Sequence, residues 1–280
     1  MASRPDPLAA DWLALCRRAA EGLRGVLREY PTTAQRAVET GRGEGGDLSL
    51  VIDRGAEDVV FGLLAELHEQ GHRFMAISEE RGEVDFGGGP VQVIVDPIDG
   101  SLNAKRDLPP HALSVAVADG PTMADVAFGY VFDFGTGQEW RATRGQGAHV
   151  DDELLDTTPR ERRTSAGMLE VVGIESAHPR WVAARIDGLL GEVHRLRAFG
   201  SIALTLCQVA AARLDGMVSL SASRGVDAAA AQLIVREGGG LVAFPACPDP
   251  LAAPLDLVPR SPVVAARTPE ALQQLASIVT

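Results

Sequence analysis

The segment Val93-Ile94-Val95-Asp96-Pro97-Ile98-Asp99-Gly100-Ser101-Leu102-Asn103 joins an apolar run to two closely spaced acids. The apolar residues predict a buried β-strand that ends at Asp96. Pro97 fixes the backbone after the first acid, and Gly100 permits a tight turn after the second. Asp96 and Asp99 can therefore converge on one point beyond the strand. Carboxylates, a backbone carbonyl and waters are the ligands that suit a hard cation such as Mg²⁺.

Two aspartates at a strand end can also serve only as turn formers and helix caps. Two further acidic positions favour a site instead. Glu79 and Glu80 end another apolar run, and the Arg81-Gly82 that follows argues against a helix that they could cap. Asp227 opens a predicted helix and is followed by alanines at 228–231. Asp227 is a good N-cap in its own right, but small side chains at a helix start let a ligand approach, and helix N-termini attract phosphate.

The composition is that of an ordinary globular protein. The chain has 280 residues, 46% hydrophobic residues and a formal net charge of -12, and its Pro and Gly are scattered. A chain of this length forms one compact unit or two packed domains. The acidic balance argues against a broad surface for nucleic-acid polymers or acidic membranes. An anionic substrate would need local help, such as a bound divalent cation.

The cysteines and the apolar segments bear on the cellular compartment. The 3 cysteines are widely spaced and form no CxxC pair, so neither a disulfide framework nor a zinc site is indicated. No signal-like N-terminus and no apolar stretch of about 18 residues is present. We therefore expect a soluble protein of the cytoplasm.

Helical periodicity predicts helices over 8–29 and 55–70. Short β-like runs then follow too closely for helices to separate most of them, which predicts an antiparallel sheet. These runs span 91–95, 113–118, 126–132, 139–143 and 169–173. From Pro179 onward the pattern alternates as in a layered α/β half: a helix, a helix over 201–212, a strand over 217–220, a helix over 227–237, strands over 241–244 and 263–266, and a terminal helix from Pro269.

A glycine-rich stretch over 41–46 formally matches the GxGxxG pattern of dinucleotide-binding loops. That pattern has meaning only between a strand and a helix of a βαβ unit, whereas here a helical-looking segment precedes it and an extended run over 48–52 follows. A turn or lid is the simpler interpretation. The 6 histidines show no metal-ligand spacing, and no Walker lysine motif or GxSxG elbow offers a competing chemistry.

The acidic motifs resemble those of a known family. Asp96-Pro-Ile-Asp99-Gly-Ser101-x-Asn103 is similar to the DPIDGT/S signature of the inositol monophosphatase and fructose-1,6-bisphosphatase superfamily of Mg²⁺-dependent, lithium-sensitive phosphatases. Ser78-Glu79-Glu80 resembles the upstream glutamate motif, and Val226-Asp227-x-Ala229-Ala230 with the glycines after Glu237 resembles the WDxAA…GG motif. The stretch over 46–53 with Glu57, and the stretch from 199–204 through 213–216, extend the likeness over nearly the whole chain.

The resemblance implies a fold and a metal site. The fold would be a layered αβαβα sandwich of α/β (α+β) class, a single unit over 1–280 with approximate lobes 1–175 and 176–280. Glu79, Asp96 and the carbonyl of Ile98 would hold one Mg²⁺, and Asp96, Asp99 and Asp227 a second. A third, weaker ion would sit near Glu79, and a homodimer is the default assembly.

The resemblance also implies catalytic roles. A metal-activated water, oriented by Ser101 and its partner Asp47, would attack the phosphate, with Glu79 as a further catalytic residue. The amides of Gly100 and Ser101 would take phosphate oxygens, with Asp227 close to the substrate. Ser219 takes roughly the place of the family's acidic residue that contacts inositol hydroxyls, so a hydroxyl contact is altered there.

Three departures concern the substrate. Val226 replaces the usual Trp, as in the archaeal-type dual inositol monophosphatase/fructose bisphosphatase branch, and Ala104 replaces an aromatic residue. Lys105-Arg106 are either a solvated loop tip or a clamp for a second phosphate. We expect a phosphomonoesterase acting on a small phosphorylated metabolite, foremost inositol 1-phosphate. Alternatives are fructose 1,6-bisphosphate, 3′-phosphoadenosine 5′-phosphate, or a non-catalytic phosphosugar-binding protein, which would have no use for the water-activating residues.

Overall fold

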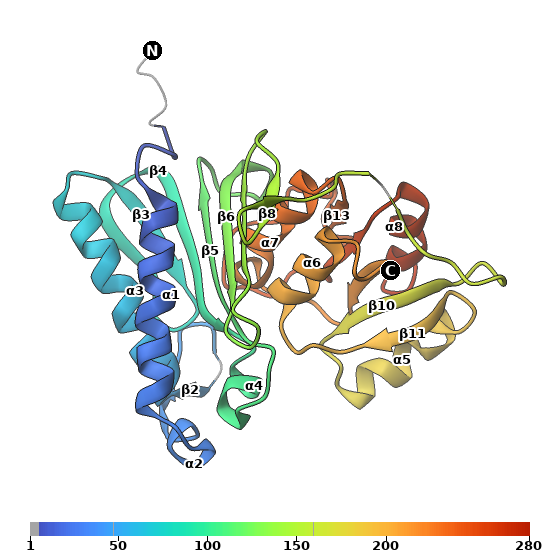
Figure 1. Cartoon of the computed structure of the whole chain (residues 1–280), viewed down its shortest axis with the longest axis horizontal. Helices are drawn as coiled ribbons and strands as arrows, with labels where there is room; N and C mark the ends of the chain where they lie inside the picture. The colour runs from blue at the N-terminus through green and yellow to red at the C-terminus, as the bar shows by residue number, and fades with distance from the viewer. Residues whose placement is uncertain (1–5, 47, 159) are drawn as a thin grey trace.

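Two large β-sheets, with helices between and outside them, form the body of the structure (Figure 1). The computed structural model describes residues 6–46, 48–158 and 160–280. The outer helices of the first sheet are α1 (Trp12–Glu29) and α3 (Val51–Glu69), the central helices are α6 (Ile202–Ala210) and α7 (Gly225–Glu237), and the outer helices of the second sheet are α5 (Pro179–Leu189) and α8 (Pro269–Ala276). This order of layers confirms the predicted αβαβα sandwich.

The first sheet has seven strands in the order β3-β4-β5-β6-β7-β8-β9. They are β3 (Phe74–Ser78), β4 (Gly82–Asp99), β5 (Ala112–Ala118), β6 (Val126–Asp133), β7 (Glu139–Thr143), β8 (Ala148–Val150) and β9 (Glu153–Leu154). Strand β3 pairs in parallel with residues 92–95 of β4 and also lies along residues 82–86 of β4 in the opposite direction. The other neighbours in this sheet pair antiparallel. The four strands predicted between 91 and 143 all lie here, so the antiparallel N-terminal sheet is confirmed.

The outer helices of this sheet begin where side chains cap them. Helix α1 begins at Trp12, later than predicted, because the Asp11 carboxylate accepts a hydrogen bond of 3.0 Å from the Ala14 amide. Helix α3 begins at Val51, earlier than predicted, and the Asp53 carboxylate accepts a 3.0 Å hydrogen bond from the Leu50 amide. The earlier start turns Asp53 toward the protein interior, where it is 5% exposed.

A small hairpin precedes α3. After α2 (Thr33–Arg36), strands β1 (Glu39–Arg42) and β2 (Leu48–Leu50) pair antiparallel. The glycine-rich stretch thus lies at the end of a β-hairpin and not between a strand and a helix of a βαβ unit, in agreement with its interpretation as a turn. Its backbone packs on the end of β3 and the residues after it, because the Gly45 and Glu44 amides donate to the carbonyls of Glu79 and Glu80 at 2.8 and 3.1 Å.

The central helices pack tightly between the sheets. The alanines at 228–231 of α7 are all buried, and a Cβ on Gly129 of β6 would lie only 2.5 Å from the carbonyl oxygen of Ala230. A side chain at Gly129 would therefore push the helix off the sheet. Helix α7 begins at Gly225, two positions before the predicted start at Asp227, so Asp227 lies in its first turn.

The second sheet has five strands in the order β11-β10-β12-β14-β13. They are β10 (Leu169–Glu175), β11 (Val193–Arg197), β12 (Gly216–Ser219), β13 (Leu241–Ala243) and β14 (Val264–Ala266). The prediction that residues 169–173 join the antiparallel sheet is wrong, because β10 pairs in parallel with β11 and β12. Strand β11 was not predicted, since it is an edge strand with exposed charges and no apolar alternation. The division into lobes at residue 175 stays a prediction.

Among the residues that the structure describes, no helix is both long and apolar enough to cross a membrane.

Arg267 ties three segments together inside the second half of the molecule. Its side chain is 1% exposed. One terminal nitrogen donates to the carbonyls of Ala210 and Gly238, at the ends of α6 and α7, at 2.9 and 2.8 Å. The other donates to the carbonyls of Asp156 and Thr158 at 3.3 and 3.0 Å. A buried cation at two helix C-termini satisfies carbonyls that each helix leaves without a partner.

Replacing Arg267 by Met should lower the free energy of unfolding by about 3 kcal/mol or more, because several buried carbonyls would lose their donor. Urea unfolding measures the change. The exposed Arg106→Met is the control and should stay within about 0.5 kcal/mol of the parent. Equal stability of the two variants would contradict a structural role for Arg267.

Candidate active site

The sequence signature forms a strand end, a tight turn and a short helix. Strand β4 carries an irregularity between Asp96 and Asp99, where Pro97 interrupts the pairing with β5. Gly100 follows with a φ of 92°, and a Cβ there would lie 3.0 Å from the carbonyl oxygen of Gly200. Only glycine fits this position. Helix α4 (Ser101–Arg106) then begins.

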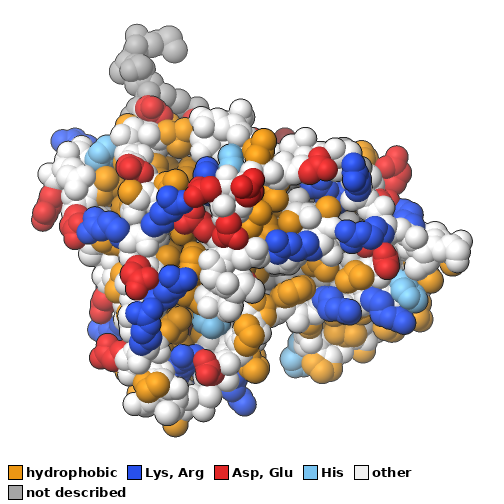
Figure 2. Space-filling model, in the orientation of Figure 1, with side chains coloured by type: hydrophobic (Ala, Val, Ile, Leu, Met, Phe, Trp, Pro, Cys, Tyr) orange, Lys and Arg blue, Asp and Glu red, His pale blue; other side chains and the backbone are white. Residues whose placement is uncertain are grey.

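Helix α4 is held against the second half of the molecule. The Asn103 side-chain amide donates to the carbonyls of Pro110 and Phe199, both at 2.7 Å. The site therefore lies between the two halves, and Figure 2 shows this face of the molecule hollowed between the parts that carry α4 and α5.

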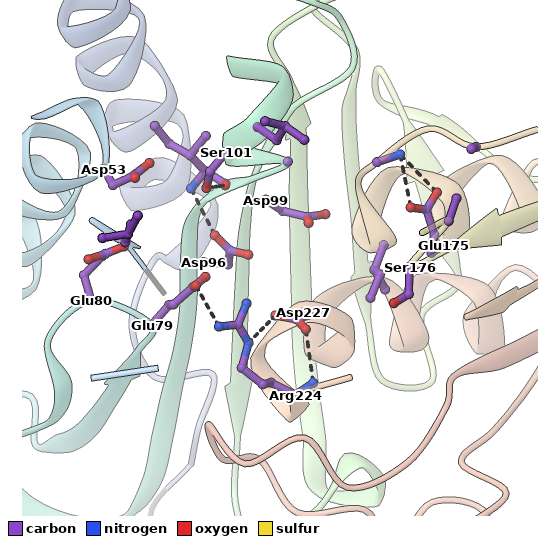
Figure 3. A pocket seen from close by; sticks show the side chains of 18 residues that line it. Asp53, Glu79, Glu80, Asp96, Asp99, Ser101, Glu175, Ser176, Arg224 and Asp227 are labelled. Carbon is purple, nitrogen blue, oxygen red and sulfur yellow. Dashed lines mark hydrogen bonds and ion pairs between the residues drawn. The ribbon is translucent and has the colours of Figure 1, made fainter. Parts of the chain in front are cut away.

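Three predicted metal ligands converge. Glu79, Asp96 and Asp227 each place a carboxylate oxygen such that these atoms lie within 4.8 Å of one another (Figure 3). Glu79 follows β3, Asp96 belongs to β4, and Asp227 belongs to α7, so the group joins the first sheet to the central helices. Asp96 is 4% exposed. Burial, together with the charges of Glu79, Asp99 and Asp227, raises the pKa of Asp96 well above its ordinary value.

This donor set fits a hard divalent cation. Buried carboxylates this close repel one another, and a bound cation removes that cost. Oxygen ligands from separate elements are the kind that Mg²⁺ takes. The acidic group could therefore hold a metal.

Asp99 and Ile98 do not join this group in the structure described. The Asp99 carboxylate accepts hydrogen bonds from the Ser201 hydroxyl at 2.5 Å and the Ala203 amide at 2.8 Å, at the start of α6. Burial raises its pKa from 3.8 to about 7, which the Ser201 hydroxyl opposes. The Ile98 carbonyl accepts a 2.9 Å hydrogen bond from the Ser101 hydroxyl. Both predicted ligands line the same pocket but are engaged with protein partners.

Asp53 is a site residue that sequence reasoning missed. Burial raises its pKa to about 7, whereas the Leu50 amide and, more weakly, the Ser101 hydroxyl lower it. Among the residues described, its Oδ1 atom has no hydrogen-bond partner. Figure 3 shows the Asp53 carboxylate on the Ser101 side of the pocket. Asp47, the partner predicted for Ser101, lies outside the described residues.

Arg224 is the second residue that was missed. It is the N-cap residue of α7. Its Nη1 atom lies 2.7 Å from Glu79 Oε1, and its Nε lies 3.3 Å from Asp227 Oδ1. Figure 3 shows the guanidinium reaching into the acidic group from below. The only available signal was its place immediately before a helix start that carries an acid.

The pocket extends from the acidic group to the second sheet and has a volume of about 470 Å³. Its far wall consists of Glu175 and Ser176 at the end of β10, followed by Ala177 and Ala198. Arg224 is the one Lys, Arg or His among the described residues that line it. Lys105 and Arg106 lie on α4 and do not contribute to the lining.

Ser219 also lies outside the pocket lining. It is fully buried in β12, where its hydroxyl donates to the Ser221 carbonyl at 3.0 Å and accepts from the Val263 amide at 2.7 Å. The Ser219 hydroxyl thus joins β12 to the segment before β14, and its contact with a substrate stays a prediction.

Glu175 is a buried acid at the far wall. Its carboxylate accepts hydrogen bonds from the Thr205 hydroxyl at 2.6 Å and from the amides of Phe199 and Gly200 at 3.1 Å. Burial nevertheless raises its pKa from 4.5 to about 7. Because the pKa is higher in the folded state, the protonated form stabilises the fold fully below about 4.5, and this contribution is lost as the pH rises through about 7.

We therefore expect the unfolding free energy, measured by urea denaturation in chelator, to fall as the pH rises from about 5 to about 8. Glu175→Gln should reduce this fall, because it removes one titrating group from the folded state. Asp53 and Asp99 titrate in the same direction and remain in the variant, so part of the slope should persist. An unchanged slope would mean that Glu175 is already charged in the fold at low pH.

Comparison with known proteins identifies the family. The inositol monophosphatase family model matches residues 8–280. A fructose-1,6-bisphosphatase/inositol-1-monophosphatase of Methanothermobacter thermautotrophicus is 32% identical over 244 residues, which cover 82% of this chain and 83% of that protein. The Nus factor SuhB of Escherichia coli strain K12 is 33% identical over 222 residues, 78% of each chain.

Solved structures show the same fold. A crystal structure of an inositol monophosphatase-fructose 1,6 bisphosphatase aligns with a TM-score of 0.81 at 23% identity, covering 96% of this chain and all of that one, 100%. The extragenic suppressor protein SuhB of Bartonella henselae aligns with a TM-score of 0.77 at 23% identity, covering 96% and 98%. Together with the acidic group at the predicted motifs, these matches show that the chain belongs to the inositol monophosphatase family and is a phosphatase that hydrolyses phosphate monoesters.

Proposed function

We propose that this phosphatase is Mg²⁺-dependent and hydrolyses inositol 1-phosphate, or a closely similar polyol monophosphate, to the free polyol and phosphate. The observation that carries the proposal is the convergence of Glu79, Asp96 and Asp227 at one end of the pocket. Apart from Glu175, the opposite end is lined by small, uncharged side chains. One end would serve the phosphate and the other a hydroxyl-rich leaving group.

The metal ligands we propose are Glu79, Asp96, Asp99, Asp227 and the carbonyl of Ile98, holding two to three ions. Bound cations would neutralise the phosphate oxygens and make a neighbouring water more acidic. The buried position of Asp96 and the shared repulsion of its neighbours support this ligand set. Asp99 and Ile98 would have to exchange their present partners, Ser201 and Ser101, for the ion.

The chain's own residues would orient the attacking water and the phosphate. Ser101 stands at the start of α4, between the Ile98 carbonyl and Asp53, so its hydroxyl can accept from a water and pass its own hydrogen bond to either partner. We propose Asp53 as the partner of Ser101 in place of Asp47. Gly100 and Ser101 both line the pocket, and their amides at the helix start would take phosphate oxygens.

The substrate proposal rests on charge. A second phosphate needs a cationic partner. Among the described lining residues only Arg224 is cationic, and it lies at the metal end. A fructose 1,6-bisphosphatase activity is therefore the weaker alternative, although relatives carry both names. Family membership disfavours the non-catalytic binding protein. A homodimer in the cytoplasm is proposed on the resemblance alone.

Phosphate release with Mg²⁺ tests the substrate. The panel contains inositol 1-phosphate, fructose 1,6-bisphosphate, 3′-phosphoadenosine 5′-phosphate and histidinol phosphate. We expect the highest kcat/KM for inositol 1-phosphate. Replacing Lys105 and Arg106 together by Ala should change the activation barrier for hydrolysis of each substrate by no more than about 0.5 kcal/mol, since neither residue lines the pocket. A loss of kcat/KM on fructose 1,6-bisphosphate alone would support the hypothesis that Lys105 and Arg106 bind a second phosphate. Full turnover in excess chelator would contradict the proposed metal dependence.

A further inference from the structure

Arg224 bridges two of the three carboxylates that could hold a metal. Its Nη1 contacts Glu79 Oε1 at 2.7 Å, its Nε contacts Asp227 Oδ1 at 3.3 Å, and its backbone amide donates to Asp227 Oδ2 at 3.1 Å. The three side chains are only partly exposed, 16% for Arg224, 13% for Glu79 and 12% for Asp227. Solvent therefore screens these contacts less than it would at the surface.

The guanidinium is enclosed as well as paired. It comes from the N-cap residue of α7, and Gly45, between β1 and β2, lies against it. A Cβ on Gly45 would lie 3.0 Å from Arg224 Nη1 and 2.9 Å from Glu79 Cγ. Because Gly45 has no side chain, the guanidinium and the Glu79 side chain can occupy this space next to each other.

The charges in the group do not balance. The guanidinium contacts two of the three carboxylates, and Arg224 is the one cationic side chain among the described lining residues, so three negative charges face a single positive one. A divalent ion among the same oxygens would neutralise more of the charge. It would also repel the guanidinium, since two cations a few ångströms apart in a partly buried site disfavour each other. Arginine and a divalent ion therefore exclude each other from Glu79 and Asp227.

We propose that Arg224 is an internal cation that occupies the acidic group and must be displaced before a divalent ion binds there. This inference rests on the proposed metal-dependent function. Its consequence is a lowered metal affinity, because the measured affinity includes the free energy of breaking the Arg224 contacts. The competing arginine also keeps the carboxylates together when little divalent ion is present.

Metal titration tests the inference without measuring activity. Isothermal titration calorimetry with Mg²⁺ and with Mn²⁺ compares the parent with Arg224→Met, which keeps an unbranched chain and removes the charge. We expect Arg224→Met to bind each ion about tenfold more tightly or better, equivalent to about 1.4 kcal/mol. Arg260→Met is the matched control, because Arg260 pairs with Asp256 outside the pocket lining; it should leave the affinity unchanged.

Thermal unfolding gives a second measurement on the same proteins. In chelator, Arg224→Met should melt at a lower temperature than the parent, because the carboxylates lose their cation, and added Mg²⁺ should raise its Tm by more than it raises the parent's. Equal or weaker metal binding by Arg224→Met overturns the inference alone. Failure of both proteins to bind Mg²⁺ and Mn²⁺ would instead overturn the proposed metal dependence.

Discussion

Asp227→Asn should lower the rate of phosphate release by on the order of 10³-fold or more, a barrier increase of about 4 kcal/mol. The carboxylate belongs to the acidic group, and a neutral amide would hold a divalent ion far less well. The fold should survive, because the asparagine side chain can still accept the hydrogen bond that the Arg224 amide donates to Asp227. Steady-state kinetics at saturating inositol 1-phosphate and Mg²⁺ measure the loss.

Two further measurements make this result specific. Asp187→Asn removes an exposed carboxylate of α5 and should keep full activity. Calorimetry should show weaker Mg²⁺ binding by Asp227→Asn, with an unfolding midpoint in chelator close to that of the parent. Near-parental turnover would mean that Asp227 serves the helix start and not a metal.

Ser101→Ala should reduce kcat by about 10²- to 10³-fold while changing KM much less, because a group that orients the attacking water acts chiefly in the transition state. Asp53→Asn should show the same pattern if Asp53 is the partner of Ser101. This pairing is supported by the Ser101 hydroxyl, which lowers the pKa of the Asp53 carboxyl.

Asp47→Asn is the discriminating comparison. If Asp53 carries the role, Asp47→Asn should lose much less in kcat than Asp53→Asn. The reverse order of losses would return the role to Asp47. A rise in KM alone for Ser101→Ala would show that the hydroxyl binds substrate and does not orient the water.

The acids that could be predicted from sequence are those whose position follows from local pattern. Asp96 and Glu79 come directly after apolar runs, and Asp227 lies at a helix start. Each acid therefore lies near one end of a strand or helix, at the edge of its layer. The layered fold followed from the same alternation of short strands and amphipathic helices. The short strands β8 and β9 and the exposed edge strand β11 were not predicted.

The residues that could not be predicted depend on tertiary packing. Asp53 faces the interior because α3 begins at Val51, which the apolar spacing did not reveal. The stretch over 46–53 with Glu57 that resembles the family's acidic segment includes Asp53, but its local pattern does not show which of its acids faces the pocket. Arg224 meets Glu79 only because the end of β3 and the start of α7 come together from distant parts of the chain. Asp99 is diverted by the start of α6.

The contrast between the walls of the pocket has a consequence for engineering new substrate specificity. Helix α7, which brings Asp227 to the pocket, has no space to move away from it, since its alanines lie against β6, where a Cβ on Gly129 would lie only 2.5 Å from the carbonyl oxygen of Ala230. The opposite wall is built from Ser176, Ala177 and Ala198, which follow the ends of β10 and β11 in loops. Loop positions accept larger side chains at little cost in stability. Mutant libraries confined to these three positions should retain folded protein while sampling leaving groups of different size and charge.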